Sequence, residues 1–218
     1  TNGSIVLAAL LLKAGPYGLL RFNLDLFPEA SRYFADAIGI LAVVGIVYGA
    51  LVAMMQTDVK RLVAFSSVSH MGFVILGIFT FTMQGTSGAV MQMVNHGLST
   101  GLLFFVVGAL YERTHTRDLS EMGGLAKVTP WIAAAFLVAT LSSIGLPGLN
   151  NFVGEFLVIV GAFGTDRVLG AVAVSGVVLA AIYMLWAYQR AFQGPGSERH
   201  GRLADLVPRE IAAVVPVV

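Results

Sequence analysis

The chain has no cysteine among its 218 residues, and it has few charged residues. Without cysteine it can form no disulfide, hold no iron–sulfur cluster through thiolates and carry out no thiol chemistry. Charged residues make up 11% of the sequence, whereas soluble domains contain about 25%. This scarcity argues against a separate soluble domain, and the scattered basic residues form no stripe that would bind nucleic acid. The four histidines form no pair with the spacing of metal ligands, so we expect no metal site.

Apolar residues take the place of the missing charge and make up 57% of the chain. A helix needs about 20 mostly apolar residues to cross the hydrocarbon core of a bilayer. On this rule we predict an all-α, polytopic transmembrane helical bundle that forms a single transmembrane domain over 1–218. Its spans are predicted at about 3–20, 35–55, 62–82, 87–111, 130–164 and 168–189, with the start of a seventh near Ile211.

The third and fourth spans are read from a long stretch without charge. No lysine, arginine, aspartate or glutamate occurs between Arg61 and Glu112, and this length requires two helices. We predict the turn between them at 84–88, where the sequence is QGTSG, because glycine and serine favour turns.

The fifth span is too long for one crossing, and GLPG interrupts it at 145–148, followed by Asn150 and Asn151. Proline removes a backbone donor and glycine lets the chain bend. We therefore predict a discontinuous helix over about 130–164, although a simple proline kink is an alternative. In lipid, a break survives where it is buried in protein or lines a water-filled cavity. Broken helices of this kind form ion sites in transporters.

Basic residues predict which loops share a side of the membrane. Nine of them fall in the loops at 56–61, 111–129 and 190–209, and the opposite side has three, at Arg21, Arg32 and Arg167. By the positive-inside rule, the richer set faces the cytoplasm or an organelle matrix. We expect a multi-pass protein of the bacterial inner membrane with its basic loops in the cytoplasm.

Four ionisable side chains lie within the predicted spans: Lys13, His70, His96 and Glu155. Such residues are costly in a bilayer and usually mark ion or proton pathways. At a rise of 1.5 Å per residue, each lies about 12–14 Å from one end of its helix, near the midplane. Histidine titrates near neutrality, and neighbouring groups titrate as a coupled set. We therefore predict a proton relay along the membrane plane through these four residues.

Each of the four also has a plainer interpretation. Either histidine can be a hydrogen-bonded packing residue, and Lys13 can extend its side chain to the outer surface. Glu155 can form a structural ion pair with a buried cation. Lys13 has the apolar Ala9 one turn before it and Gly15 and Pro16 after it, so a partner for it must come from another helix.

His96 has local support for a role in the relay. Gln92, His96, Ser99 and Thr100 recur at helical spacing and form one polar face on an otherwise apolar helix. Such a face could hold ordered water.

Four stretches resemble the antiporter-like membrane subunits of respiratory complex I: LLLKAGPYGLLRFNLDLFP, QTDVKRLVAFSSVSHMGF, NHGLSTGLLFFVVGALYERTHTRDLSEMGGL and GLPGLNNFVGEF. The YERTHTR and GGL segments and the glutamate of VGEF are similar to the M-type chains, the counterpart of mitochondrial subunit 4. The resemblance runs in order across nearly the whole chain. It implies a fold of fourteen core helices with two inverted five-helix repeats, each containing a broken helix. This chain would be a fragment covering helices eight to thirteen and the start of fourteen.

The resemblance also implies a function, which is proton translocation coupled to electron transfer from NADH to quinone. Lys13 would be the central lysine of helix eight, His96 a connecting histidine and Glu155 the glutamate of the exit half-channel. His70 matches a histidine whose role the resemblance leaves open. The chain would bind no cofactor itself and would act as a non-redox subunit. Its partners would be the bilayer and other membrane subunits of complex I, especially neighbouring antiporter-like ones.

Two other functions remain open at this point. Subunits of multisubunit Mrp-type Na⁺/H⁺ antiporters are similar in fold and in most of these motifs, and sodium-dependent transport without redox partners would indicate that function. A passive scaffold that only anchors neighbouring helices is the third possibility. It would tolerate neutral residues in place of Lys13 and Glu155.

Overall fold

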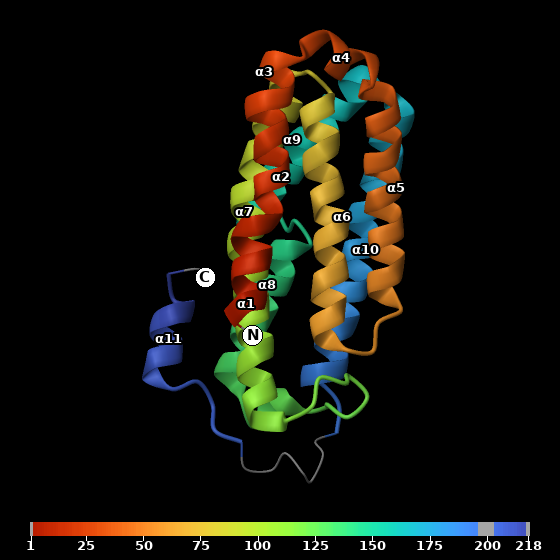
Figure 1. Cartoon of the computed structure of the whole chain (residues 1–218). Coiled ribbons are helices and arrows are strands. Elements are labelled where there is room, and N and C mark those ends of the chain that lie inside the picture. Colours follow the sequence, from red (N-terminus) through yellow and green to blue (C-terminus); the bar gives the residue numbers. More distant parts are fainter. Residues whose placement is uncertain (1, 196–202, 217–218) are drawn as a thin grey trace.

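The structure, a computed structural model, describes residues 2–195 and 203–216. Within these ranges the chain is helical and contains no β-strand. The long helices lie side by side in one elongated bundle (Figure 1), which confirms the predicted all-α fold. Arg199 and Arg202, which belong to the basic loop predicted from the sequence, lie outside the described residues.

The first helix changes type along its length without a break. It consists of α1 (Asn2–Val6), the π-helical segment η1 (Leu7–Leu11), α2 (Leu12–Gly18), a second π-helical segment η2 (Leu19–Asn23) and α3 (Leu24–Leu26). Pro16 lies inside α2, where its missing N–H removes one backbone hydrogen bond. Only 11% of the membrane-crossing part of this helix is buried, so the helix lies on the surface of the bundle.

Two long helices, α6 (Val59–Phe79) and α7 (Met83–Thr114), form the centre of the bundle. In each of them 72% of the membrane-crossing part is buried. The short α4 (Pro28–Tyr33) leads from the first helix to α5 (Ala35–Met54), which packs along α6. The helix α5 also packs against α10 (Arg167–Phe192).

The turn between α6 and α7 does not lie where the sequence predicted it. The turn occupies 80–82, and the predicted turn segment 84–88 belongs to α7. Phe81 adopts a φ of 53°, and the Thr82 hydroxyl caps α7 by accepting a hydrogen bond from the Gly85 amide at 3.0 Å. The glycines of this segment serve helix packing instead of a turn, because they lie against the backbone of a neighbouring helix.

The predicted discontinuous helix is confirmed. Its first half is α8 (Pro130–Ser143), and its second half is α9 (Asn150–Thr165). In the intervening segment Gly145 and Gly148 have φ values of 76° and 100°, which favour glycine because it has no Cβ. The second half packs mainly against α7 and α10, so the break lies beside the centre of the bundle.

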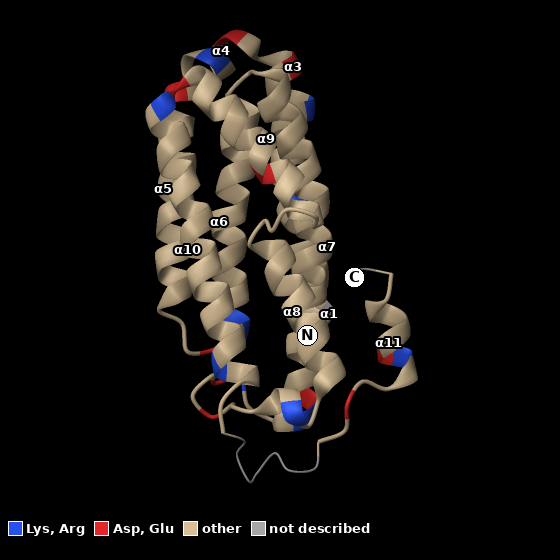
Figure 2. Ribbon diagram, turned by 180° about the vertical axis from the view of Figure 1, so that it is seen from behind, with Lys and Arg blue, Asp and Glu red and all other residues tan. Residues whose placement is uncertain are grey.

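Charged residues gather at the two ends of the bundle, and its middle is almost free of them (Figure 2). One end, called the basic end below, holds the loops that follow α5, α7 and α10, and the other end holds α4. The basic loops at 56–61 and 111–129 therefore share an end, as their charge predicts. That this end faces the cytoplasm remains a prediction of the positive-inside rule.

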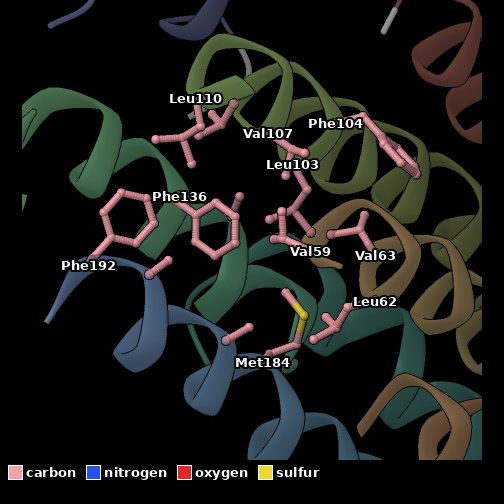
Figure 3. Packing of buried hydrophobic residues seen from close by; sticks show 14 of the residues in the cluster. Val59, Leu62, Val63, Leu103, Phe104, Val107, Leu110, Phe136, Met184 and Phe192 are labelled. Atoms are coloured by element: carbon pink, nitrogen blue, oxygen red, sulfur yellow. The ribbon is translucent and has the colours of Figure 1, made fainter. Parts of the chain in front are cut away.

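An apolar core fills the half of the bundle next to the basic end. Side chains from α6, α7, α8 and α10 interdigitate there (Figure 3), including Leu62, Leu103, Phe136 and Met184, all at most 2% exposed. Between membrane helices, close packing of this kind supplies much of the attraction. The core also separates the polar centre of the bundle from the basic end.

The last helix, α11 (Pro208–Val214), starts slightly before the span predicted from Ile211 and is held to the bundle by Arg113 of α7. The Arg113 guanidinium donates to both carboxylate oxygens of Glu210, at 2.6 and 3.2 Å. It also donates to the backbone carbonyl of Asp205 at 3.1 Å. This bidentate pair fixes the segment 203–214 at the basic end.

Replacing Glu210 with glutamine should loosen the segment 203–214. The hydrogen bonds from Arg113 hold the pKa of Glu210 below its usual range. The charged carboxylate therefore contributes its full stabilisation above about pH 4.3, and this contribution is lost as the pH falls through the lower pKa of the folded state. At pH 7 the substitution should remove about 1–2 kcal/mol. Hydrogen exchange of 203–214 should then quicken roughly tenfold.

The matched control is Glu112→Gln, because Glu112 is exposed on α7 next to Arg113. It should leave exchange in the segment 203–214 unchanged. Equal exchange in Glu210→Gln and the wild type would show that the pair does not hold the segment.

Candidate functional site

Lys13 and His96 meet where the first helix crosses α7. The Lys13 ammonium donates to Nδ1 of His96 at 2.7 Å and to the carbonyl of Ala8. The two helices approach closely because residue 97 is glycine: a Cβ there would lie 2.9 Å from the carbonyl oxygen of Ala9. His96 is thus the partner that Lys13 requires from another helix.

The polar face predicted on α7 is buried inside the bundle. Gln92, His96, Ser99 and Thr100 are each less than 5% exposed. The Thr100 hydroxyl lies 3.1 Å from Nε2 of His96. Because an ammonium can only donate, Nδ1 of His96 accepts from Lys13 and Nε2 carries the ring proton in neutral His96.

His70 of α6 faces Glu155 of α9, and both are buried. Nδ1 of His70 lies 2.9 Å from Oε1 of Glu155, and the two residues are 2% and 3% exposed. Gln92 donates to the same carboxylate oxygen, also at 2.9 Å. The sequence left the place of His70 open, and the structure puts it beside the carboxylate.

The two histidines lie next to each other and connect the two pairs. The centroids of the His70 and His96 rings are 5.3 Å apart, and the ring planes make an angle of 51°. No hydrogen bond joins these two residues, both of which the structure describes. The four predicted residues therefore form one array in the order Lys13, His96, His70, Glu155.

The break between α8 and α9 sets the position of Glu155. The carboxylate packs directly on Gly145, where a Cβ would lie 2.7 Å from Oε2. Backbone and side-chain bonds attach the start of α9 to α7: Asn95 donates to the carbonyl of Asn150 at 2.6 Å, and Asn151 donates to the Ser99 hydroxyl at 2.9 Å. The half-helix end is thus held against the polar face of α7.

The two ends of the array differ in their access to the surface. An open, mainly apolar groove of 670 Å³ lies beside Lys13, between the first helix and α7, with Tyr17 and Val94 in its lining. Glu155 is enclosed on the opposite side. Lys13 is therefore the end of the array that borders the outer surface of the bundle, and Glu155 is the end that lies inside it.

The arrangement suits proton transfer better than metal binding. Each member of the array can gain or lose a proton, and the surrounding helices are apolar. In the described ranges, no group of three or more histidine, aspartate or glutamate side chains could hold a metal ion. Asn95, Asn150 and Asn151 were not expected at the site from the sequence, although the last two follow the predicted break.

The sequence matches the family described as NADH:quinone oxidoreductase/Mrp antiporter, TM, over residues 1–182. It is 48% identical over 215 residues to the NADH-quinone oxidoreductase subunit M of Pseudomonas aeruginosa, an alignment that covers 99% of this chain and 42% of that protein. For the subunit M of Mycobacterium tuberculosis the identity is 45%, over 99% of this chain and 39% of that protein. The chain thus spans about two fifths of the length of these relatives.

Solved structures show the same fold. Respiratory complex I from Thermus thermophilus contains a chain that matches 94% of this one with a TM-score of 0.90 and 36% identity, and the match covers 43% of that chain. The Mrp complex from Dietzia contains a chain that matches 84% of this one with a TM-score of 0.79 and 27% identity, over 34% of its own length.

Proposed function

Because the chain belongs to the NADH:quinone oxidoreductase/Mrp antiporter membrane family, we propose that it translocates protons as part of an antiporter-like subunit of a NADH–quinone oxidoreductase. The array of Lys13, His96, His70 and Glu155 is the observation that supports this most strongly. Burying ionisable groups in a membrane costs free energy, so a connected row of them indicates a function.

In the proposed mechanism the proton moves along the array from Lys13 to Glu155. The Lys13 ammonium donates its proton to Nδ1 of His96, which it already contacts. After transfer between the histidines, Nδ1 of His70 protonates Oε1 of Glu155, 2.9 Å away. Each transfer changes the charge next to the following group, so the four sites titrate as a coupled set. Quinone reduction elsewhere in the assembly would change the charge at one end and supply the driving force.

The same proposal assigns partners and a location. The NADH and quinone chemistry would take place on other subunits, and this chain would pack against neighbouring membrane subunits and the bilayer. Its relatives in Pseudomonas and Mycobacterium are bacterial proteins, which supports the bacterial inner membrane. The charge distribution supports a cytoplasmic basic end.

An Mrp-type cation/proton antiporter is the alternative function. The match to the Mrp complex from Dietzia supports it, although the identity to the subunit M relatives is higher. The purified assembly separates the two. NADH-driven quinone reduction with acidification of the liposome lumen supports the proposed function, whereas sodium-dependent proton transport without any NADH activity supports the antiporter.

Glu155→Gln tests the relay in the full-length subunit within its native assembly, reconstituted in liposomes. Glutamine has nearly the same shape and can still bond His70 or Gln92, but it cannot take up a proton. We expect quinone reduction and acidification to fall together by about tenfold, the loss of about 1.4 kcal/mol of transition-state stabilisation.

Glu29→Gln provides the control, because Glu29 is an exposed glutamate on α4. It should leave both activities unchanged, and native gels should show intact assembly for both variants. If Glu155→Gln kept full quinone reduction and full acidification, the relay assignment would be wrong and the scaffold function would be favoured.

A further inference from the structure

The first half of the broken helix, α8, takes no N-cap from the residue that precedes it. The Thr129 hydroxyl donates to the carbonyl of Leu125 at 2.9 Å and caps no amide of α8. Pro130 follows at the first helical position, where its missing N–H leaves no donor to satisfy. The first amides of the helix that need an acceptor are therefore those of Trp131 and Ile132.

Asp205 supplies both acceptors from a distant part of the chain. One of its carboxylate oxygens accepts a hydrogen bond from the Trp131 amide at 2.8 Å, and the other accepts one from the Ile132 amide at 3.1 Å. Asp205 is half-buried in the segment 203–214, and its negative charge suits the N-terminus of a helix. The cap of α8 therefore depends on where this segment lies.

Arg113 fixes that segment to α7. Its guanidinium donates to the backbone carbonyls of Ala204, at 2.7 Å, and Asp205, at 3.1 Å, in addition to the bidentate pair with Glu210. The helix α7 carries the polar face of the site, and α8 leads to the break. One short segment thus sets the position of α8 along α7 at the basic end.

The other end of α8 lies at the polar site. The helix has 14 residues, so at 1.5 Å per residue it is about 21 Å long. Ser142 in its last turn donates to the side chain of Asn150, and Gly145, two residues beyond the helix end, packs on the Glu155 carboxylate. A rigid helix carries a shift of its first turn to its last. Displacement of α8 would therefore move the backbone against which Glu155 packs.

We propose that Asp205 is a positioning residue of the proton relay: by capping α8 it fixes this half-helix along α7 and so holds the Glu155 carboxylate opposite His70. This inference rests on the proposed function. Asp205 carries no proton itself, because it binds two backbone amides at the far end of α8 from the array. A misplacement of about 1 Å at a reacting group can lower a rate about a hundredfold. A contact at the basic end thus controls the geometry of the buried site.

Asp205→Ala in the full-length subunit of the intact assembly tests the proposal. The substitution removes both acceptors, so amide hydrogen exchange in the first turn of α8 should quicken about fivefold. Quinone reduction and acidification per assembled complex should fall together, also about fivefold, because Glu155 loses its fixed position. Asp205→Asn keeps a side-chain oxygen, and asparagine caps helices about as well as aspartate. It should retain most of both activities, which would not be so if the carboxylate carried protons.

Asp166→Ala is the matched control, because Asp166 caps the unbroken helix α10 in a similar way. Its carboxylate accepts from the amides of Val168 and Leu169 at 2.7 and 3.2 Å. Exchange in the first turn of α10 should quicken to a similar degree, while both activities stay at the wild-type level. Equal losses of activity in Asp166→Ala and Asp205→Ala would show a general effect of a lost cap and would overturn the positioning role.

The double variant Asp205→Ala with Ser142→Ala shows whether α8 transmits the effect. Residues 132 and 142 are about 15 Å apart along the helix, and the effects of separate sites at such a distance normally multiply. If Asp205 acts through α8, the double variant should lose less than the product of the two single losses. Losses that multiply, or wild-type activity in Asp205→Ala, would overturn the proposal while leaving the result of Glu155→Gln intact. Full activity in Glu155→Gln would instead overturn the relay, and Asp205 would then have no relay to position.

Discussion

Lys13→Met should lower acidification and the coupled quinone reduction by at least about twentyfold, more than any other substitution in the array. Methionine keeps the length of the side chain but cannot donate to Nδ1 of His96. The change also removes the only cation of the array, at its partly exposed end. Without the Lys13 ammonium no group passes a proton to His96, so transfer along the array should stop at its first step.

The measurement is the liposome assay with both activities followed together. Lys127→Met is the control, because Lys127 is exposed in the short 3-10 helix η3 (Leu125–Lys127) at the basic end, away from the array. The double variant Lys13→Met with Glu155→Gln adds a second test. It removes both charges, so assembly should be as stable as in the wild type while transport stays absent. Restored transport in the double variant would mean that these residues balance charge and do not carry protons.

Gly88→Val should prevent assembly of the subunit altogether. A Cβ at position 88 would lie 2.7 Å from the amide nitrogen of Val158 and 2.9 Å from the carbonyl oxygen of Gly154. Both atoms belong to the backbone of α9 and cannot move aside as a side chain can. Forcing atoms into a packed interior costs about 1–3 kcal/mol and sometimes more, and here the two helices must separate.

Separation would also break the site, because Gln92 lies one turn further along the same face of α7 and bonds Glu155. Intact complex on native gels and its Tm measure the effect. Gly164→Val is the control on α9 itself, since no described atom lies within 4 Å of a Cβ built there. A Gly88→Val subunit that assembled with an unchanged Tm would contradict the close packing of α7 on α9.

The sequence predicted this fold well where the signal is local. Long apolar runs, and the proline and glycines at 145–148, are enough to predict a membrane bundle with a broken helix. The predicted turn at 84–88 was wrong because glycine is compatible both with a turn and with the close packing of two helices. At Gly85 and Gly88 the missing side chain admits another helix, and one sequence alone does not show which use applies.

The sequence was enough to predict which residues form the candidate site and at what depth they lie, but not which of them contact each other. Counting residues along each helix places Lys13, His70, His96 and Glu155 near one depth. It does not tell which face of α6 turns towards α9, so the bond between His70 and Glu155 could not be derived.

The π-helical segments η1 and η2 shift the phase of the first helix. A π-helical turn contains more residues than an α-helical turn, so each segment rotates the face that follows it relative to the face before it. This rotation lets Ala8 and Lys13 face α7 while Leu20 and Leu24 pack against the apolar cluster around Ile78. Deleting one residue from η2 would leave a regular helix that still crosses the bilayer, yet one of these two contacts would be lost. The number of residues in this helix is therefore constrained by the two faces that must meet α7 and the cluster around Ile78, more than by the length needed to cross the bilayer.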